Sequence, residues 1–174
     1  MHQYKKIALS AVLVAAMMAL AGAIAPAREL VRARADSEAA WHDIVRIHAS
    51  RIEAASAALD AERTIDAAPA RSSLARARAV RADDSVLYDA QRINHYKQQQ
   101  GELTGALHML AAGEHGGAGA LDALRERLVR DEVALSAARA RYGEASARYQ
   151  SIIRTATGAT LVAVLRYPEL PAAL

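Results

Sequence analysis

One seam of regularly spaced side chains runs without a break through residues 120–156. The spacing alternates between three and four residues, as in an α-helix that buries one stripe along its whole length. At about 1.5 Å per residue such a helix is roughly 55 Å long, so it must pack lengthwise against other long helices. The stripe holds Leu121, Leu124, Leu128, Asp131, Leu135, Ala138, Tyr142, Ala145, Tyr149, Ile152 and Ala156. It predicts an all-α protein with coiled-coil-like packing, in which Asp131 is the only strongly polar stripe position.

The amino-acid composition favours helices over strands and excludes several kinds of functional site. Only 4% of the 174 residues are aromatic and there is no Phe, which disfavours a sheet of aromatic and β-branched residues. The absence of Cys excludes a disulfide framework, a thiolate nucleophile and a thiolate metal site. The net charge is +3, and Lys5 and Lys6 carry two of these charges. The remainder is therefore nearly neutral, so we expect no nucleic-acid binding.

The N-terminal segment is a membrane anchor or a signal sequence. Residues 7–25 carry no charge and only Ser10 as a polar side chain, and their number is close to the roughly 20 that cross a hydrocarbon core. Small residues at 21–23 and 25–27 suit a signal peptidase, so cleavage is one alternative. We favour a retained anchor.

The orientation of that anchor depends on the flanking positive charges. Lys5 and Lys6 precede the apolar run, whereas Arg28, Arg32 and Arg34 follow it. The counts nearly balance under the positive-inside rule. Because the lysines lie closer to the run, we expect a single-pass protein of the bacterial inner membrane with its soluble domain on the periplasmic side.

Two further helical stretches are predicted. The first starts at Asp36 or Ser37, which are candidate N-caps, and it ends before a turn near residue 68, where Pro69 suits the start of a second helix. The second covers about residues 70–112, with a possible break at residues 83–85, and the glycine-rich residues 113–119 then form a cap and loop.

The first stretch has a stripe of Trp41, Val45, His48, Ile52, Ala55, Leu59 and Ile65. The second has Ala75, Ala79, Ala82, Val86, Asp89, Ile93, Tyr96, Gln100, Leu103, Leu107 and Leu110. Because short turns join long helices, neighbours run antiparallel. The predicted fold is an antiparallel bundle of three to four long helices with an N-terminal transmembrane helix. Its parts are an anchor or signal segment at 1–27, a bundle at 28–158 and a short apolar tail at 159–174.

The last long helix carries Glu132, Ala138, Arg139, Tyr142 and Tyr149, and the apolar residues 161–163 follow it. The first stretch carries Glu38, Trp41, Ile44 and Arg51. In these residues the chain resembles the LemA family of membrane-anchored bacterial helical-bundle proteins. Gly143 and Gln150 replace family Asn residues, His48 replaces a Leu, and residues 54–59 replace a Leu-Ile-Pro-Asn-Leu-Val segment. The resemblance implies one N-terminal span, a bundle of up to four helices and no established biochemical activity.

Candidate chemistry is limited. None of the six histidines forms a His-Glu-x-x-His arrangement, so we expect no metal site, and we expect no cofactor or catalytic residue. Asp131 and Glu132 diverge by about 100° on a helix and do not form a catalytic pair. We interpret Glu132 as the ion-pair partner of Arg139, Arg46, Arg51 or another arginine, and Asp131 as a buried group that fixes helix register. The predicted structural or interaction residues are Trp41, Arg51, Asp131, Glu132, Arg139, Tyr142 and Tyr149.

Two functional hypotheses follow from these features. The first is a non-enzymatic, membrane-anchored envelope scaffold or interaction module that binds a protein partner or itself. The alternative is a sensory or small-ligand-binding bundle facing the periplasm, in which Asp131, His48 or the tyrosines line a cavity between helices. A hydrolase is disfavoured, because no nucleophile and base are spaced to act together.

Overall fold

The computed structural model describes the backbone except at residues 1, 62–65, 114–118, 168–169 and 172–174, and it describes side chains from residue 24 onward apart from these and Asp84. The described residues form α1 (His2–Ala61), α2 (Ala68–Ala79), a 3-10 helix η1 (Asp84–Tyr88), α3 (Ala90–Ala112), α4 (Gly119–Ile153) and α5 (Ala156–Leu165). No strand occurs among them. The prediction of an all-α protein is confirmed.

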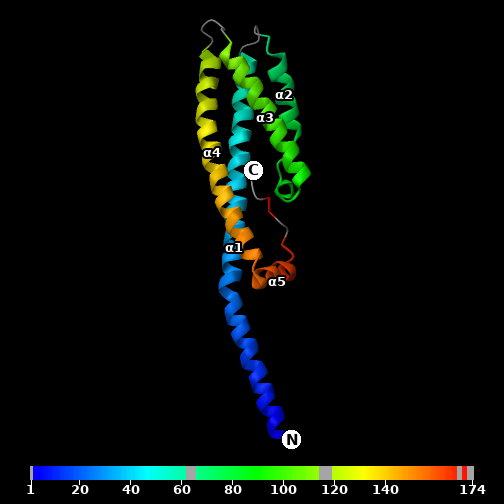
Figure 1. Cartoon of the computed structure of the whole chain (residues 1–174). Helices are drawn as coiled ribbons and strands as arrows, with labels where there is room; N and C mark the ends of the chain where they lie inside the picture. The colour runs from blue at the N-terminus through cyan, green and yellow to red at the C-terminus, as the bar shows by residue number, and fades with distance from the viewer. Residues whose placement is uncertain (1, 62–65, 114–118, 168–169, 172–174) are drawn as a thin grey trace.

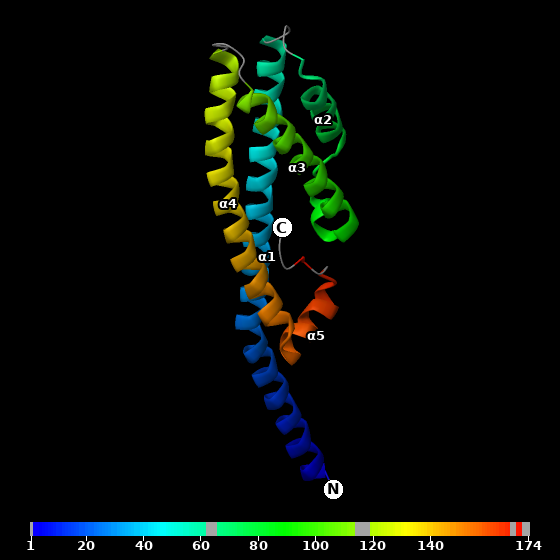
Figure 2. The same ribbon diagram turned by 45° about the horizontal axis from the view of Figure 1, so that its top comes forward.

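Two long helices form the axis of the molecule. α1 and α4 share the most extensive contact between any two elements, and Figures 1 and 2 show α4 running beside α1 in the opposite direction. The predicted stripe of α4 is buried from Leu121 through Tyr149, with Asp131 included. It ends earlier than predicted: Ile152 is only half-buried, α4 ends at Ile153, and Ala156 is exposed in the next helix.

α1 does not begin at the residue predicted for it. The helix is continuous through residues 27–37, so neither Asp36 nor Ser37 is an N-cap, and the predicted boundary between 27 and 28 falls inside α1. The buried Ser37 hydroxyl instead donates to the Ala33 carbonyl at 2.8 Å. A serine inside a helix satisfies its hydroxyl in this way without interrupting the backbone ladder.

The second predicted stretch is two helices and not one. It breaks near the candidate position, because Asp83 accepts the Ser85 amide at 3.0 Å and starts η1, while Asp89 accepts the amides of Gln91 and Arg92 and caps α3. The stripe from Val86 to Leu110 is buried except at Asp89, but Ala75 and Ala79 are exposed. α2 buries a different face, formed by Ala70, Ser73, Leu74 and Ala77.

The turns that the structure describes occur at the proline and glycine residues that predicted them. Pro69 lies in the first turn of α2, where its missing amide costs no hydrogen bond. Gly113 is the C-cap residue of α3. Ile65 and most of the predicted glycine loop, at 114–118, lie outside the described residues.

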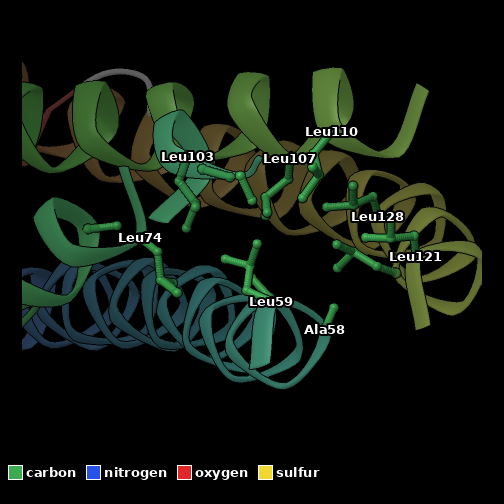
Figure 3. Packing of buried hydrophobic residues seen from close by; sticks show 13 residues of the cluster. Ala58, Leu59, Leu74, Leu103, Leu107, Leu110, Leu121 and Leu128 are labelled. Atoms are coloured by element: carbon green, nitrogen blue, oxygen red, sulfur yellow. The ribbon is translucent and has the colours of Figure 1, made fainter. Parts of the chain in front are cut away.

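The core divides into two main apolar clusters. One joins α1, α2, α3 and α4 at the end of the molecule shown in Figure 3, through side chains such as Leu59, Leu74, Leu107 and Leu128. The other lies toward the opposite end and joins α1, η1, α3, α4 and Leu170. Between them α1, α3 and α4 contribute buried polar residues, which we call the polar layer: His48, Arg51, Gln99, Gln100 and Asp131.

The apolar tail forms α5 on the side of α1. Its N-cap Thr155 accepts the Gly158 amide at 3.0 Å. The predicted boundary between the bundle and the tail, after residue 158, falls inside α5. Gly158 lies there at a position where a Cβ would collide with the Ile152 carbonyl. Glycine here permits the close approach of α5 to the end of α4.

From residue 24 onward, where side chains are described, no helix is both long and apolar enough to cross a membrane. The predicted span at 7–25 lies almost entirely outside that part of the chain.

Candidate functional site

Arg51 is the centre of the polar layer. Its side chain is 1% exposed, and its guanidinium donates to the Thr104 hydroxyl at 2.5 Å and to Glu132 Oε1 at 2.9 Å. Thr104 in turn donates to the Gln100 carbonyl at 2.8 Å. Arginine suits this position because its planar group donates in several directions and stays charged when buried. Arg51 thus joins α1 to α3 and α4.

Asp131 lies beside this arginine. Its Oδ2 atom is 3.7 Å from Arg51 Nε, and its Oδ1 accepts from Arg127 at 2.9 Å. Arg127 also donates to the Ser50 hydroxyl at 2.6 Å. Arg51 of α1 and Arg127 of α4 compensate the buried carboxylate. Sliding α4 along α1 would separate Asp131 from Arg51 and leave it only the arginine of its own helix. The predicted register role of Asp131 has a physical basis in these contacts.

A cavity of about 320 Å³ opens beside Arg51. The helices α1, α3 and α4 all contribute to its wall. The lining side chains are Trp41, Ile44, His48, Arg51, Tyr96, Lys97, Gln100, Gly101, Thr104, Glu132 and Arg139. Of the seven predicted residues, the structure brings Trp41, Arg51, Glu132 and Arg139 together here. Asp131 contacts Arg51 from outside the lining set.

His48 and Tyr96 form one polar edge of the cavity. His48 Nδ1 and the Tyr96 hydroxyl share a hydrogen bond of 2.9 Å. Burial, together with the positive charges of Arg51 and Arg139, lowers the pKa of His48 to about 3. Burial raises the pKa of Tyr96. Both groups are therefore neutral at physiological pH, and the pair stabilises the site without adding charge.

Three groups of lining residues are buried without a hydrogen-bond partner among the described residues: the Trp41 Nε1–H donor, the Arg51 Nε–H donor and the Gln100 Oε1 acceptor. Of these, Arg51 Nε lies 3.7 Å from the charge of Asp131 Oδ2. Trp41 is 1% exposed, and its indole packs edge-on against Tyr96 with the ring centroids 5.3 Å apart. Leaving a buried polar atom unpaired costs about 1–3 kcal/mol. Such atoms in a cavity wall are suited to bonding a guest molecule.

The charges around the cavity are unequal. Glu132 is the one acid in the lining, whereas Arg51, Lys97 and Arg139 are positive and His48 is neutral. Asp131 and Glu132 already compensate Arg51. Lys97 and Arg139, both exposed at the outer side of the cavity, supply the surplus positive charge. The predicted pairing of Glu132 with an arginine is found, and the partner is Arg51.

The two predicted tyrosines lie elsewhere. Tyr142 and Tyr149 are fully buried in the cluster that includes Leu30 and Leu170. The Tyr142 hydroxyl donates to the Pro171 carbonyl at 2.9 Å. This contact is structural, because it ties the C-terminal segment to α4, and neither tyrosine lines the cavity.

Sequence reasoning did not select Tyr96, Lys97, Gln100 or Thr104 as site residues. The sequence predicted that Tyr96 and Gln100 lie on a buried stripe. They belong to the site because the tertiary structure places this part of α3 beside His48 of α1 and Asp131 of α4. The signal in the sequence was a polar interruption of the stripe on each of three helices, at His48, Gln100 and Asp131.

The described residues contain no group of His, Asp and Glu side chains arranged to hold a metal ion. No protein-family model, curated protein or solved structure matches the chain.

Proposed function

We propose that the chain is a non-enzymatic, membrane-anchored, antiparallel helical bundle that binds a small organic anion in the cavity between α1, α3 and α4. The observation that carries this proposal is the buried Trp41 N–H in the wall of a cavity with surplus positive charge. The proposal develops the second sequence hypothesis, in which a polar cavity between helices holds a small ligand. Anchoring through residues 7–25 in a bacterial inner membrane, a periplasmic soluble part and the resemblance to the LemA family belong to the same proposal.

The ligand class follows from the lining. Surplus positive charge from Lys97 and Arg139 and an unpartnered N–H donor favour an anion with acceptor oxygens. Trp41 and Ile44 supply an apolar wall, which favours a hydrocarbon or aromatic body over a bare inorganic ion. A carboxylate of modest size satisfies both parts of the surface.

A thermal-shift screen tests the proposal. Small organic acids, each paired with its neutral amide (for example benzoate with benzamide), are added to the full chain in a non-ionic detergent. An acid at ten times its Kd should add about 1.4 kcal/mol of stability, and its amide should add much less. A screen in which no acid exceeds its amide would contradict the anion assignment.

Two substitutions make the screen specific to this cavity. Arg139→Gln removes one of the surplus charges and should weaken acid binding. The matched control is Arg130→Gln, because Arg130 is an exposed arginine of the same helix outside the cavity lining. Equal weakening by both variants would indicate a general charge effect and not a site.

A scaffold that binds a protein or a second copy is the other candidate function, and one observation favours it. Val129 and Val133, one helical turn apart on α4, are 59% and 70% exposed. Light scattering of the full chain with and without Val133→Glu tests this reading: a scaffold that self-associates through this face should become smaller in the variant.

A further inference from the structure

Exposed apolar side chains gather at one end of the molecule. Of seven large hydrophobic residues exposed in the described part of the chain, four lie there: Ile24, Val31, Val164 and Leu165. Ile24 and Val31 lie seven residues apart on α1, and hence on one face of it. Val164 and Leu165 are at the end of α5. The two pairs come from opposite ends of the sequence, and the helices that carry them, α1 and α5, contact each other in the fold.

α5 is held in a fixed position at this end. Leu161 and Val162 pack against the cluster that contains Leu30 and Tyr149, whereas Val164, in the last turn of α5, is 73% exposed. Figures 1 and 2 show α5 lying across the direction of α1, on the side of the molecule from which the N-terminal part of α1 projects. Gly158 fixes the close approach to α4, because any side chain there meets the Ile152 carbonyl.

The height of α5 along α1 fits a membrane surface. Leu30 and Ala33 of α1 share a cluster with the inner face of α5, and they follow Ala25, the last residue of the apolar run, by five and eight positions. At about 1.5 Å per residue these positions lie about 8–12 Å beyond the run. The headgroup layer on each side of a bilayer is about 5–8 Å thick. α5 therefore lies at the outer edge of the headgroups when residues 7–25 span the membrane.

The charges around this surface also suit lipid. Arg28 and Arg32 on α1, and Arg154 and Arg166 at either end of α5, are all exposed. Apolar side chains that enter the interface beside arginines that meet phosphate groups are the pattern of an interfacial helix. A protein partner would explain the apolar residues but not their position beside the end of a membrane-length apolar run.

We infer that α5 is an interfacial helix whose Val164 and Leu165 dock on the same bilayer that holds residues 7–25, with the neighbouring arginines on lipid phosphates. The inference rests on the proposed anchoring and adds a second contact with the membrane. With this second contact, the tilt of the α1–α4 axis relative to the membrane is fixed. A single membrane-spanning helix would leave that tilt unrestrained.

The absence of Cys makes a site-specific probe clean. A nitroxide is attached to Val164→Cys in the full chain, which is then reconstituted in phosphatidylcholine and phosphatidylglycerol vesicles. The matched control is Val133→Cys, because Val133 is also a valine, is 70% exposed, and lies on α4 about 30 Å before the end of that helix at Ile153. Vesicle flotation and helical circular dichroism are recorded for both variants.

We expect both variants to float, and the label at Val164 to collide with a water-soluble nickel chelate at least about threefold less often than the label at Val133. Floating chains with equal collision rates would overturn the docking of α5 and leave the anchor intact. Chains that do not float would overturn the anchor itself, and the docking with it. Dipolar broadening between Val164 labels would assign the surface to a second copy of the chain and likewise overturn the inference. If Val164→Cys loses helical structure, a label at Leu165→Cys replaces it with the same expected result.

Discussion

Stability of the folded chain should decrease sharply in mild acid because of His48. The side chain is 4% exposed, and burial with the nearby charges of Arg51 and Arg139 lowers its pKa from 6.5 to about 3. A base with a lowered native pKa takes up its proton first in the unfolded state. Lowering the pH through 6.5 consequently favours unfolding, and this loss grows until the pH reaches the native pKa.

The magnitude follows from the two pKa values. One pH unit between them is worth about 1.36 kcal/mol, and pH 5 lies 1.5 units below the unfolded value of 6.5. The wild-type chain should therefore lose about 2 kcal/mol at pH 5 relative to pH 7 through this residue alone. At pH 5 the native ring is still neutral, so the loss depends mainly on the unfolded value.

Urea unfolding of the full chain in a non-ionic detergent, followed by circular dichroism at pH 7 and pH 5, measures this loss. His48→Gln keeps an amide that can hydrogen-bond Tyr96 but cannot be protonated, so it should remove most of the pH-dependent loss. His108→Gln is the control, because His108 is exposed on α3. The reasoning is refuted if His48→Gln loses as much stability between the two pH values as the wild type, or if His108→Gln abolishes the loss.

Three further substitutions test the packing by the same urea method at pH 7. Arg51→Met should lower the free energy of unfolding by about 3 kcal/mol, because it leaves the buried carboxylate of Asp131 without one of its two cations. A decrease below about 1 kcal/mol would mean that the ion pairs of Arg51 contribute little to stability. Leu107→Ala removes a fully buried side chain and should cost about 3 kcal/mol, whereas Met109→Ala on the exposed face of the same helix should change stability little. Tyr142→Phe deletes the hydrogen bond to the Pro171 carbonyl and should cost about 1 kcal/mol, with lost protection of the C-terminal segment in hydrogen exchange. An unchanged exchange pattern would show that this bond does not hold the segment.

The sequence predicted burial best where the periodicity of a single helix determines which side chains are buried. The stripe from Leu121 to Tyr149 was predicted residue by residue, because a helical period on a long apolar face is a local property that packing reinforces. The break near Asp83 was also visible as a cluster of capping residues. The predicted start of a helix at Asp36 or Ser37 was wrong, since a capping residue inside an uninterrupted helix can satisfy its side chain on the preceding turn.

The sequence by itself determined that this chain is helical and that Asp131 interrupts an apolar stripe, and it predicted a cationic partner for Glu132. Only the tertiary structure decided which cation it is, because Arg51 and Glu132 are 81 residues apart. The cavity and the polar layer likewise exist only where three helices meet at one level. Residue spacing fixes the face on which a side chain lies, whereas the register between helices is set by the packing of all of them together.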